Sequence, residues 1–250
     1  MRNTVKEKLA AGQQVVGGTI DTPDPDVYCA MARAGFDFLW IEMQHSPLSY
    51  QEVARMIWAG RDLPAVPFIR VPDATEGDIQ KATDIGALGI IVPMVVEVEK
   101  IKAAAHFMKY PPAGARSLGG GQYGALYGGS YRAEANDNIA LVAMIESPAG
   151  VENAAEIASV PGVDVVFSAA TDLSSFSGHR QGEPAYEELI TRIRDETLNA
   201  GRKVGGPLQW RTREGFSFFQ APSAPAMISR GAREFLKSEE TVAPTEGTER

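Results

Sequence analysis

The chain contains a single cysteine, Cys29, among its 250 residues. One thiol can form neither an internal disulfide nor a thiolate cluster around a metal. Long hydrophobic runs are also missing, because no stretch reaches the roughly 20 apolar residues of a membrane-spanning helix. The first 13 residues are charged and lack the apolar core of a signal peptide. We therefore expect a cytoplasmic protein with no membrane partner.

Positive charge is scarce as well. The 24 Lys and Arg residues are outnumbered by 32 Asp and Glu residues, which gives a formal net charge of -8. A phosphate backbone requires a basic face, so this composition argues against a nucleic-acid partner. A small anionic substrate is still compatible with it, because one arginine can bind one carboxylate locally.

The chain does contain a regular alternation of short apolar runs and helical patterns. We expect helices over Pro25–Ala34, Tyr50–Ala59, Glu76–Ile85, Glu97–Phe107, Pro148–Ser159, Ala185–Ala200 and Pro222–Leu236. Pro25, Pro148 and Pro184 each mark a helix start, where the missing N–H of proline costs nothing. We expect eight strands, at Val15–Ile20, Phe36–Glu42, Ala65–Arg70, Gly89–Val92, Ala140–Ile145, Val163–Ser168, Lys203–Gly206 and Phe216–Gln220. Alternating strands and helices predict a parallel sheet, and eight such units predict an α/β fold closed into one (β/α)8 TIM barrel. The barrel domain should cover residues 1–237, and the polar tail 238–250 should be disordered.

The segment Tyr110–Asn138 interrupts this alternation. It is long and rich in glycine, and it lies between the fourth and fifth predicted strands. Long irregular segments inside compact domains are usually functional, so we expect a lid over the site or a contact between subunits. Its glycines match no phosphate-binding loop.

Four polar residues follow predicted strands. They are His45, Arg70, Glu146 and Asp172. In a parallel barrel the carboxyl ends of the strands share the face that carries catalysis. The two carboxylates suit Mg²⁺ or Mn²⁺, although each could instead cap the next helix. Arg70 could bind a carboxylate or an enolate, or form a structural salt bridge. His45 could carry a proton, or it could be an ordinary loop histidine.

At these positions the chain resembles the HpcH/HpaI family of metal-dependent (class II) 2-oxo acid aldolases. The resemblance runs from about residue 6 to residue 236, and it is carried by Gly35–Asp37, His45–Pro47, Arg70–Pro72, Val92–Met94, Tyr110–Arg116, Ile145–Ser147 and Thr171–Ser174. It implies a (β/α)8 barrel, usually assembled as a homo-hexamer, a trimer of dimers, with C-terminal helices exchanged between subunits.

The resemblance also implies a division of labour among the site residues. Glu146 and Asp172 would hold a divalent cation, Mg²⁺, Mn²⁺ or Co²⁺. Arg70 would stabilise an enolate, and His45, paired with Asp84, would transfer protons. Asp84 ends the helix before the fourth strand, at the opposite end of the barrel from His45. The pair would therefore need a neighbouring subunit.

Four features depart from the usual family pattern, one of them a short stretch over Gly205–Phe216, and they lie around the predicted metal site and in the pocket wall. Gln44 stands where the family commonly has Glu, and Met144 where it commonly has Gln. The segment 168–172 reads Ser-Ala-Ala-Thr-Asp, without the usual Gly-Pro. We expect the backbone N–H groups near Ala170 and Thr171 to bind the substrate carboxylate, since anions often lie at helix starts.

The sequence therefore predicts a lyase that cleaves or forms a C–C bond in a 4-hydroxy-2-oxo acid. The products would be pyruvate, or a related 2-oxo acid, and an aldehyde, formed through a metal-stabilised enolate. Either His45 or a metal-bound water could take the 4-hydroxyl proton. One alternative keeps the enolate and predicts oxaloacetate decarboxylation or macrophomate synthase-like C–C chemistry. Another is a catalytically silent barrel that binds an oxo acid, and Gln44 and Met144 motivate it.

Overall fold

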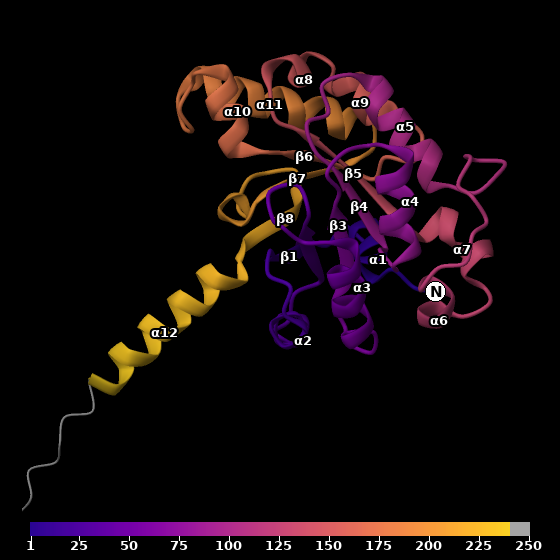
Figure 1. Ribbon diagram of the computed structural model, residues 1–250. Helices are drawn as coiled ribbons and strands as arrows, with labels where there is room; N and C mark the ends of the chain where they lie inside the picture. Colours follow the sequence, from indigo (N-terminus) through magenta and orange to yellow (C-terminus); the bar gives the residue numbers. More distant parts are fainter. Residues whose placement is uncertain (241–250) are drawn as a thin grey trace, which may run out of the picture.

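Eight parallel strands form a closed barrel in chain order, with β8 pairing back onto β1 (Figure 1). The structure, a computed structural model, describes residues 1–240. The strands are β1 Val15–Ile20, β2 Phe38–Glu42, β3 Val66–Arg70, β4 Gly89–Val92, β5 Ala140–Ile145, β6 Val165–Ser168, β7 Lys203–Pro207 and β8 Phe216–Ser223. The predicted (β/α)8 TIM barrel is confirmed, and so are all eight strands, with ends shifted by up to three residues.

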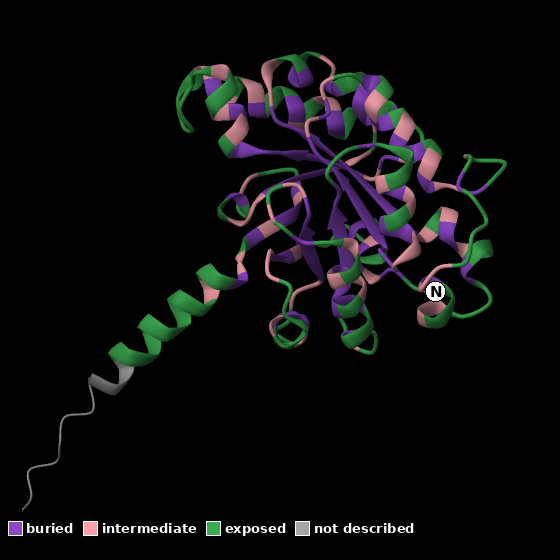
Figure 2. Cartoon of the chain, viewed as in Figure 1, coloured by how far each residue is buried: buried purple, intermediate pink, exposed green. Residues whose placement is uncertain are grey.

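Helices surround this barrel, and Figure 2 shows buried strands enclosed by helices whose outer faces are exposed. Those before β5 are α1 Thr4–Ala10, α2 Pro25–Arg33, α3 Tyr50–Ala59, α4 Glu76–Asp84, α5 Val98–Met108, α6 Tyr123–Tyr127 and α7 Tyr131–Asn138. Those after β5 are α8 Pro148–Glu152, α9 Ala154–Ser159, α10 Ala170–Ser177, α11 Pro184–Asn199, the 3₁₀ turn η1 Leu208–Trp210 and α12 Ala224–Glu240. None of the helices among residues 1–240 is both long and apolar enough to cross a membrane.

The strands are apolar on both faces because both faces are covered. Every residue of β2, β3, β4, β5 and β6 is buried. Inside the barrel, the Phe38 ring packs against Phe218 and Phe68 with centroid distances of 4.5 and 4.8 Å. Glycines make room for these rings, since a Cβ at Gly17 or Gly89 would lie 2.1 Å from the ring of Phe38 or Phe68.

This packing makes Gly89→Ala a test of the barrel interior. The added methyl group would overlap the Phe68 ring, and overpacking of this kind typically costs about 1–3 kcal/mol. We expect the free energy of unfolding, measured by chemical denaturation, to fall by that amount. Gly77→Ala is the matched control, because a Cβ at Gly77 in α4 meets no atom within 4 Å. An equal loss in both variants would contradict the packing argument.

The structure differs from the sequence prediction in two elements outside the barrel. The helix expected over 148–159 is divided at Asn153, whose side-chain amide donates to the carbonyl of Val96 (2.9 Å). The C-terminal helix α12 continues to Glu240, so the first three residues of the predicted disordered tail are helical. Residues 241–250, the rest of that tail, lie outside the described part of the chain. In Figure 1, α12 projects away from the barrel.

Candidate active site

The four residues singled out from the sequence lie at the carboxyl ends of their strands. Arg70 is the last residue of β3, Glu146 follows β5, and Asp172 lies in the first turn of α10 after β6. Arg70 donates from Nη2 to Glu146 Oε1 at 3.3 Å. Asp172 lines the same cavity as Arg70, and the backbone N–H of His45 donates to Glu42, which also accepts from Arg70. The structure therefore brings these four residues together, as predicted.

Arg70 is buried between two carboxylates. Besides Glu146, it donates from Nη1 to Glu42 Oε2 at 3.2 Å. Its Nε is buried and has no hydrogen-bond partner within residues 1–240. The structural salt bridge considered from the sequence is thus present, but it uses only two nitrogens of the guanidinium. The Nε–H group is left without a partner among the described residues, and Arg70 lines the neighbouring cavity.

Glu42 is the functional residue that the sequence reasoning missed. Its Oε1 accepts from the backbone N–H groups of Gln44 (2.8 Å) and His45 (3.1 Å). Its Oε2 accepts from the indole of Trp40 (3.3 Å) as well as from Arg70. One carboxylate therefore holds both the loop that carries His45 and the Arg70 guanidinium. The available signal was an acidic residue at the end of a strand that is otherwise apolar.

Neither predicted metal ligand serves as a helix cap. The side chain of Ser147 caps α8, and no side chain caps α10. The capping alternative is therefore wrong for both residues.

The Glu146 carboxyl group lies in a mixed electrostatic environment. Burial raises its pKa, and the nearby charge of Asp172 raises it further. The Arg70 guanidinium and the backbone N–H of Met94 oppose this shift.

The charges at this end of the barrel fit a cation. With the carboxylates ionised, Glu42, Glu146 and Asp172 face one arginine, which leaves a net negative charge. Within the described chain no cluster of three or more His, Cys, Asp and Glu side chains is placed to hold a metal ion. Two carboxylates suit a divalent cation that takes its other ligands from water and substrate, rather than one held in a closed protein cage.

A cavity of about 220 Å³ lies beside these groups. Its lining includes Arg70, Asp172 and Met144, together with Ala170 and Thr171 at the start of α10. Met144, Ala170 and Thr171, which we expected to bind the substrate, therefore line the cavity beside Arg70. Gln44 is absent from this lining, and its Oε1 is buried without a hydrogen-bond partner in the described structure.

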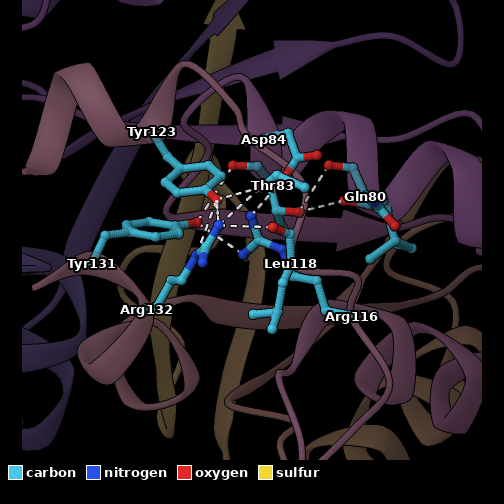
Figure 3. Close-up of polar contacts among 10 residues, drawn as sticks. Gln80, Thr83, Asp84, Arg116, Leu118, Tyr123, Tyr131 and Arg132 are labelled. Carbon is cyan, nitrogen blue, oxygen red and sulfur yellow. Dashed lines mark hydrogen bonds and ion pairs between the residues drawn. The ribbon is translucent and has the colours of Figure 1, made fainter. Parts of the chain in front are cut away.

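Asp84, in contrast, lies at the far end of the barrel within its own chain. It is the last residue of α4, and its Oδ1 accepts from Arg116 Nη2 at 2.8 Å (Figure 3). The Arg116 side chain is fully buried against three aromatic rings, with its guanidinium carbon 4.6 Å from the Tyr110 centroid and 5.3 Å from those of Tyr123 and Tyr131. The pairing of Asp84 with His45 stays a prediction.

The glycine-rich segment 110–138 belongs to this far end. Tyr127 donates its hydroxyl to the carbonyl of Gly86, and Gln122 donates to that of Ile85, both just before β4 begins. The prediction of a lid over the same chain's site is therefore wrong, because the segment follows α5 and returns to the amino ends of the strands. A contact between subunits remains compatible with this position.

Arg116→Met tests what holds this segment in place. Burial raises the pKa of the Tyr131 hydroxyl, which accepts from Arg116 at 2.9 Å and lies 3.4 Å from the Thr83 carbonyl. Removing the guanidinium would leave Asp84 and Tyr131 without their hydrogen-bond donor. We therefore expect the free energy of unfolding to fall by about 1–3 kcal/mol and proteolysis within residues 117–122 to become faster. Arg55→Met is the control, since Arg55 is exposed on α3. Unchanged proteolysis would contradict the assignment.

Comparison with known proteins gives a consistent picture. The model of the HpcH/HpaI aldolase/citrate lyase family matches residues 21–209. The chain is 34% identical over 244 residues to a hydroxypyruvate/pyruvate aldolase of Rhizorhabdus wittichii, covering 94% of this chain and 97% of that protein. It is 31% identical over 219 residues to a 2-dehydro-3,6-dideoxy-6-sulfogluconate aldolase of Pseudomonas putida, covering 83% and 85%.

A solved structure supports the same relationship. The crystal structure of an HpcH/HpaI aldolase/citrate lyase family protein from Burkholderia cenocepacia superposes with a TM-score of 0.87 at 26% identity. The match covers 96% of this chain and all of that one.

Proposed function

Because this chain belongs to the HpcH/HpaI aldolase/citrate lyase family and is a carbon–carbon lyase, we propose that it cleaves or forms the C3–C4 bond of a 4-hydroxy-2-oxo acid. The products of cleavage are pyruvate, or a related 2-oxo acid, and an aldehyde. The observation that carries the proposal is the position of Arg70, held between Glu42 and Glu146 beside the cavity that Asp172 lines.

Glu146 and Asp172 are the residues that would hold a divalent cation, Mg²⁺, Mn²⁺ or Co²⁺. When bound, such a cation supplies Lewis-acid stabilisation of the negative charge that develops on the enolate. The absence of a side-chain cap on α10 supports binding of the substrate carboxylate by the backbone N–H groups near Ala170 and Thr171.

The remaining steps use the chain's own side chains. His45 takes the proton of the 4-hydroxyl group, and the C3–C4 electrons move to C3 as C4 becomes the aldehyde carbonyl. Arg70 stabilises the enolate that forms, because its fixed guanidinium lies where the charge develops. The enolate then takes a proton at its terminal carbon from the protonated His45, which gives the 2-oxo acid and returns His45 to its starting state. In synthesis the same steps run in reverse.

In the direct test, the purified protein is incubated with each cation and with a series of 4-hydroxy-2-oxo acids. The release of pyruvate and of aldehyde is then measured. Stoichiometric release of both products is the expected result. Oxaloacetate consumed faster than any aldol substrate, without an aldehyde, would favour the decarboxylase alternative. Binding of 2-oxo acids without turnover would favour the silent barrel.

We further propose that the working enzyme is a homo-oligomer, a hexamer built as a trimer of dimers, in which Asp84 of one subunit pairs with His45 of its neighbour. Two observations support this. Asp84 Oδ2 has no hydrogen-bond partner among residues 1–240. The projecting helix α12 exposes Ile228 and Leu236, at 59% and 63%, which suits an exchanged helix.

Subunit mixing tests the shared site. His45→Ala and Asp84→Asn should each lose cleavage activity as separate proteins. When the two variants are mixed and allowed to exchange subunits, some sites regain both residues, so activity should return in part. No recovery in demonstrably mixed oligomers, or a fully active monomer by light scattering, would contradict the proposal.

A further inference from the structure

A second hollow adjoins the cavity beside Arg70, and no step of the reaction described above uses it. It has a volume of about 360 Å³ and lies at the carboxyl ends of β7, β8 and β1. Pro207, Gln209 and Gln220 line both hollows, so the two spaces are neighbours that share these residues as a common wall. Other residues line the second hollow and not the first, among them Thr19, Leu208 and Ser223.

The register of the barrel gives these spaces an order. Gln220 of β8 lies beside Pro207 of β7 and Gly17 of β1, whereas Ser223 lies beside Thr19, farther along both strands. A substrate held at Arg70 and Asp172 by its 2-oxo acid end therefore meets Gln220 first and Ser223 last. The part of the substrate beyond the reacting bond would extend into the second hollow.

The polar groups of this hollow are neutral and available. In the described part of the chain, the side-chain amides of Gln209 and Gln220 make no hydrogen bond. A glutamine amide offers both donors and an acceptor, which suits hydroxyl groups. The Thr19 hydroxyl donates to the carbonyl of Ala221 at 2.9 Å and keeps its oxygen lone pairs. Leu208 and Pro207 supply an apolar wall.

The hollow also lacks a cation. No charged side chain lines it within residues 1–240. The two nearby arginines after η1 are engaged elsewhere: Arg211 pairs with Gln14 (3.3 Å), and Arg213 forms an ion pair with Glu187 (2.6 Å). An anionic tail placed here would lose part of its hydration, since Gln209 and Pro222 on the rim stay exposed, and it would gain no positive partner, which is unfavourable.

From these observations we infer that the second hollow binds the aldehyde half of the substrate and selects uncharged, hydroxylated aldehydes over those that carry a carboxylate or a sulfonate. Gln209 and Gln220 are the specificity-determining residues, because their amides meet the hydroxyl groups next to the reacting carbonyl. The inference rests on the proposed aldol reaction and adds the chemical class of its aldehyde.

The test compares two aldehydes that differ in one group, glyceraldehyde and its carboxylate analogue 2-hydroxy-3-oxopropanoate. Each is added to pyruvate by the full-length, cation-loaded protein, and the ratio of their kcat/KM values is measured. The ratio should favour glyceraldehyde by at least about tenfold. A ratio within each protein cancels any change at the pyruvate end.

Variants then locate the preference. Leu208→Lys places a cation in the hollow and should shift the ratio toward the carboxylate aldehyde by about tenfold, whereas Leu208→Met, of similar length and neutral, should leave it unchanged. Gln220→Leu removes an amide that binds the hydroxyl groups of glyceraldehyde, whereas propanal has no hydroxyl group and loses nothing. The kcat/KM ratio of glyceraldehyde to propanal should therefore fall in this variant.

The outcomes separate the two proposals. Equal use of both aldehydes, or preference for the carboxylate form, overturns the inference while the aldol function stands. The same holds if Leu208→Lys, shown to be folded, leaves the ratio unchanged. Failure to join pyruvate to any aldehyde overturns the inference together with the proposed function.

Discussion

Arg70→Ala is expected to lower the rate of aldol cleavage by about 10²–10³-fold, the usual effect of removing one preorganised donor to a developing oxyanion. The guanidinium is buried and is held by Glu42 and Glu146 at 3.2 and 3.3 Å, and no other Arg or Lys among residues 1–240 lines the cavity, so no second basic side chain can replace it. The measurement is kcat for pyruvate release at saturating substrate and divalent cation.

Two controls separate this effect from a loss of structure. Arg70→Ala leaves two buried carboxylates without their common partner, so thermal unfolding must be measured alongside. Arg70→Lys keeps the positive charge but cannot reach both carboxylates and the substrate with a planar fork. We expect Arg70→Lys to be close to normal in stability and still strongly impaired in kcat. An Arg70→Ala protein with full activity would contradict the role given to this residue.

Glu146→Ala is expected to abolish the metal-dependent activity without unfolding the barrel. Glu146 is 2% exposed and is one of only two carboxylates that we assign to the cation, so its loss leaves Asp172 alone. The fold rests on the buried strands and the aromatic interior rather than on one ion. Cation affinity measured by calorimetry should fall together with activity, while the circular dichroism spectrum should stay unchanged.

The matched control for this variant is Glu152→Ala, on the exposed side of the helix that follows Glu146. It removes the same functional group from the same part of the chain and should leave cation affinity and activity intact. Chelator treatment of the unmodified protein should reproduce the Glu146→Ala phenotype and be reversed by Mg²⁺, Mn²⁺ or Co²⁺. Full activity after chelation would contradict the metal assignment.

The barrel could be predicted from the sequence because its strands are buried on both faces and therefore appear as short apolar runs. Gly89–Val92 and Ala140–Ile145 match the observed β4 and β5. The helix starts were also readable, since Pro25, Pro148 and Pro184 each open a helix. The helices α6 and α7 were missed because they are short and lie in a segment whose many glycines indicate an irregular loop.

The site was predictable as a set of positions but not as a network. A parallel barrel gathers strand ends on one face, which is why Arg70, Glu146 and Asp172 could be named in advance. The bonds of Glu42 could not, because they depend on how β2 and β3 align, with Glu42 beside Arg70. Arg116 likewise reaches Asp84 from 32 residues away, a distance over which sequence patterns carry no signal.

The most direct test of the account is proton exchange at the methyl group of pyruvate. Enolate formation needs the cation, Arg70 and a proton acceptor but no aldehyde, so the loaded protein in D₂O should replace the methyl protons of pyruvate with deuterium, followed by proton NMR. Exchange that requires a divalent cation and is lost in Arg70→Ala is the result we predict. Absence of exchange with Mg²⁺, Mn²⁺ and Co²⁺ alike, in a folded and cation-loaded protein, would contradict the enolate mechanism and leave the silent barrel as the better account.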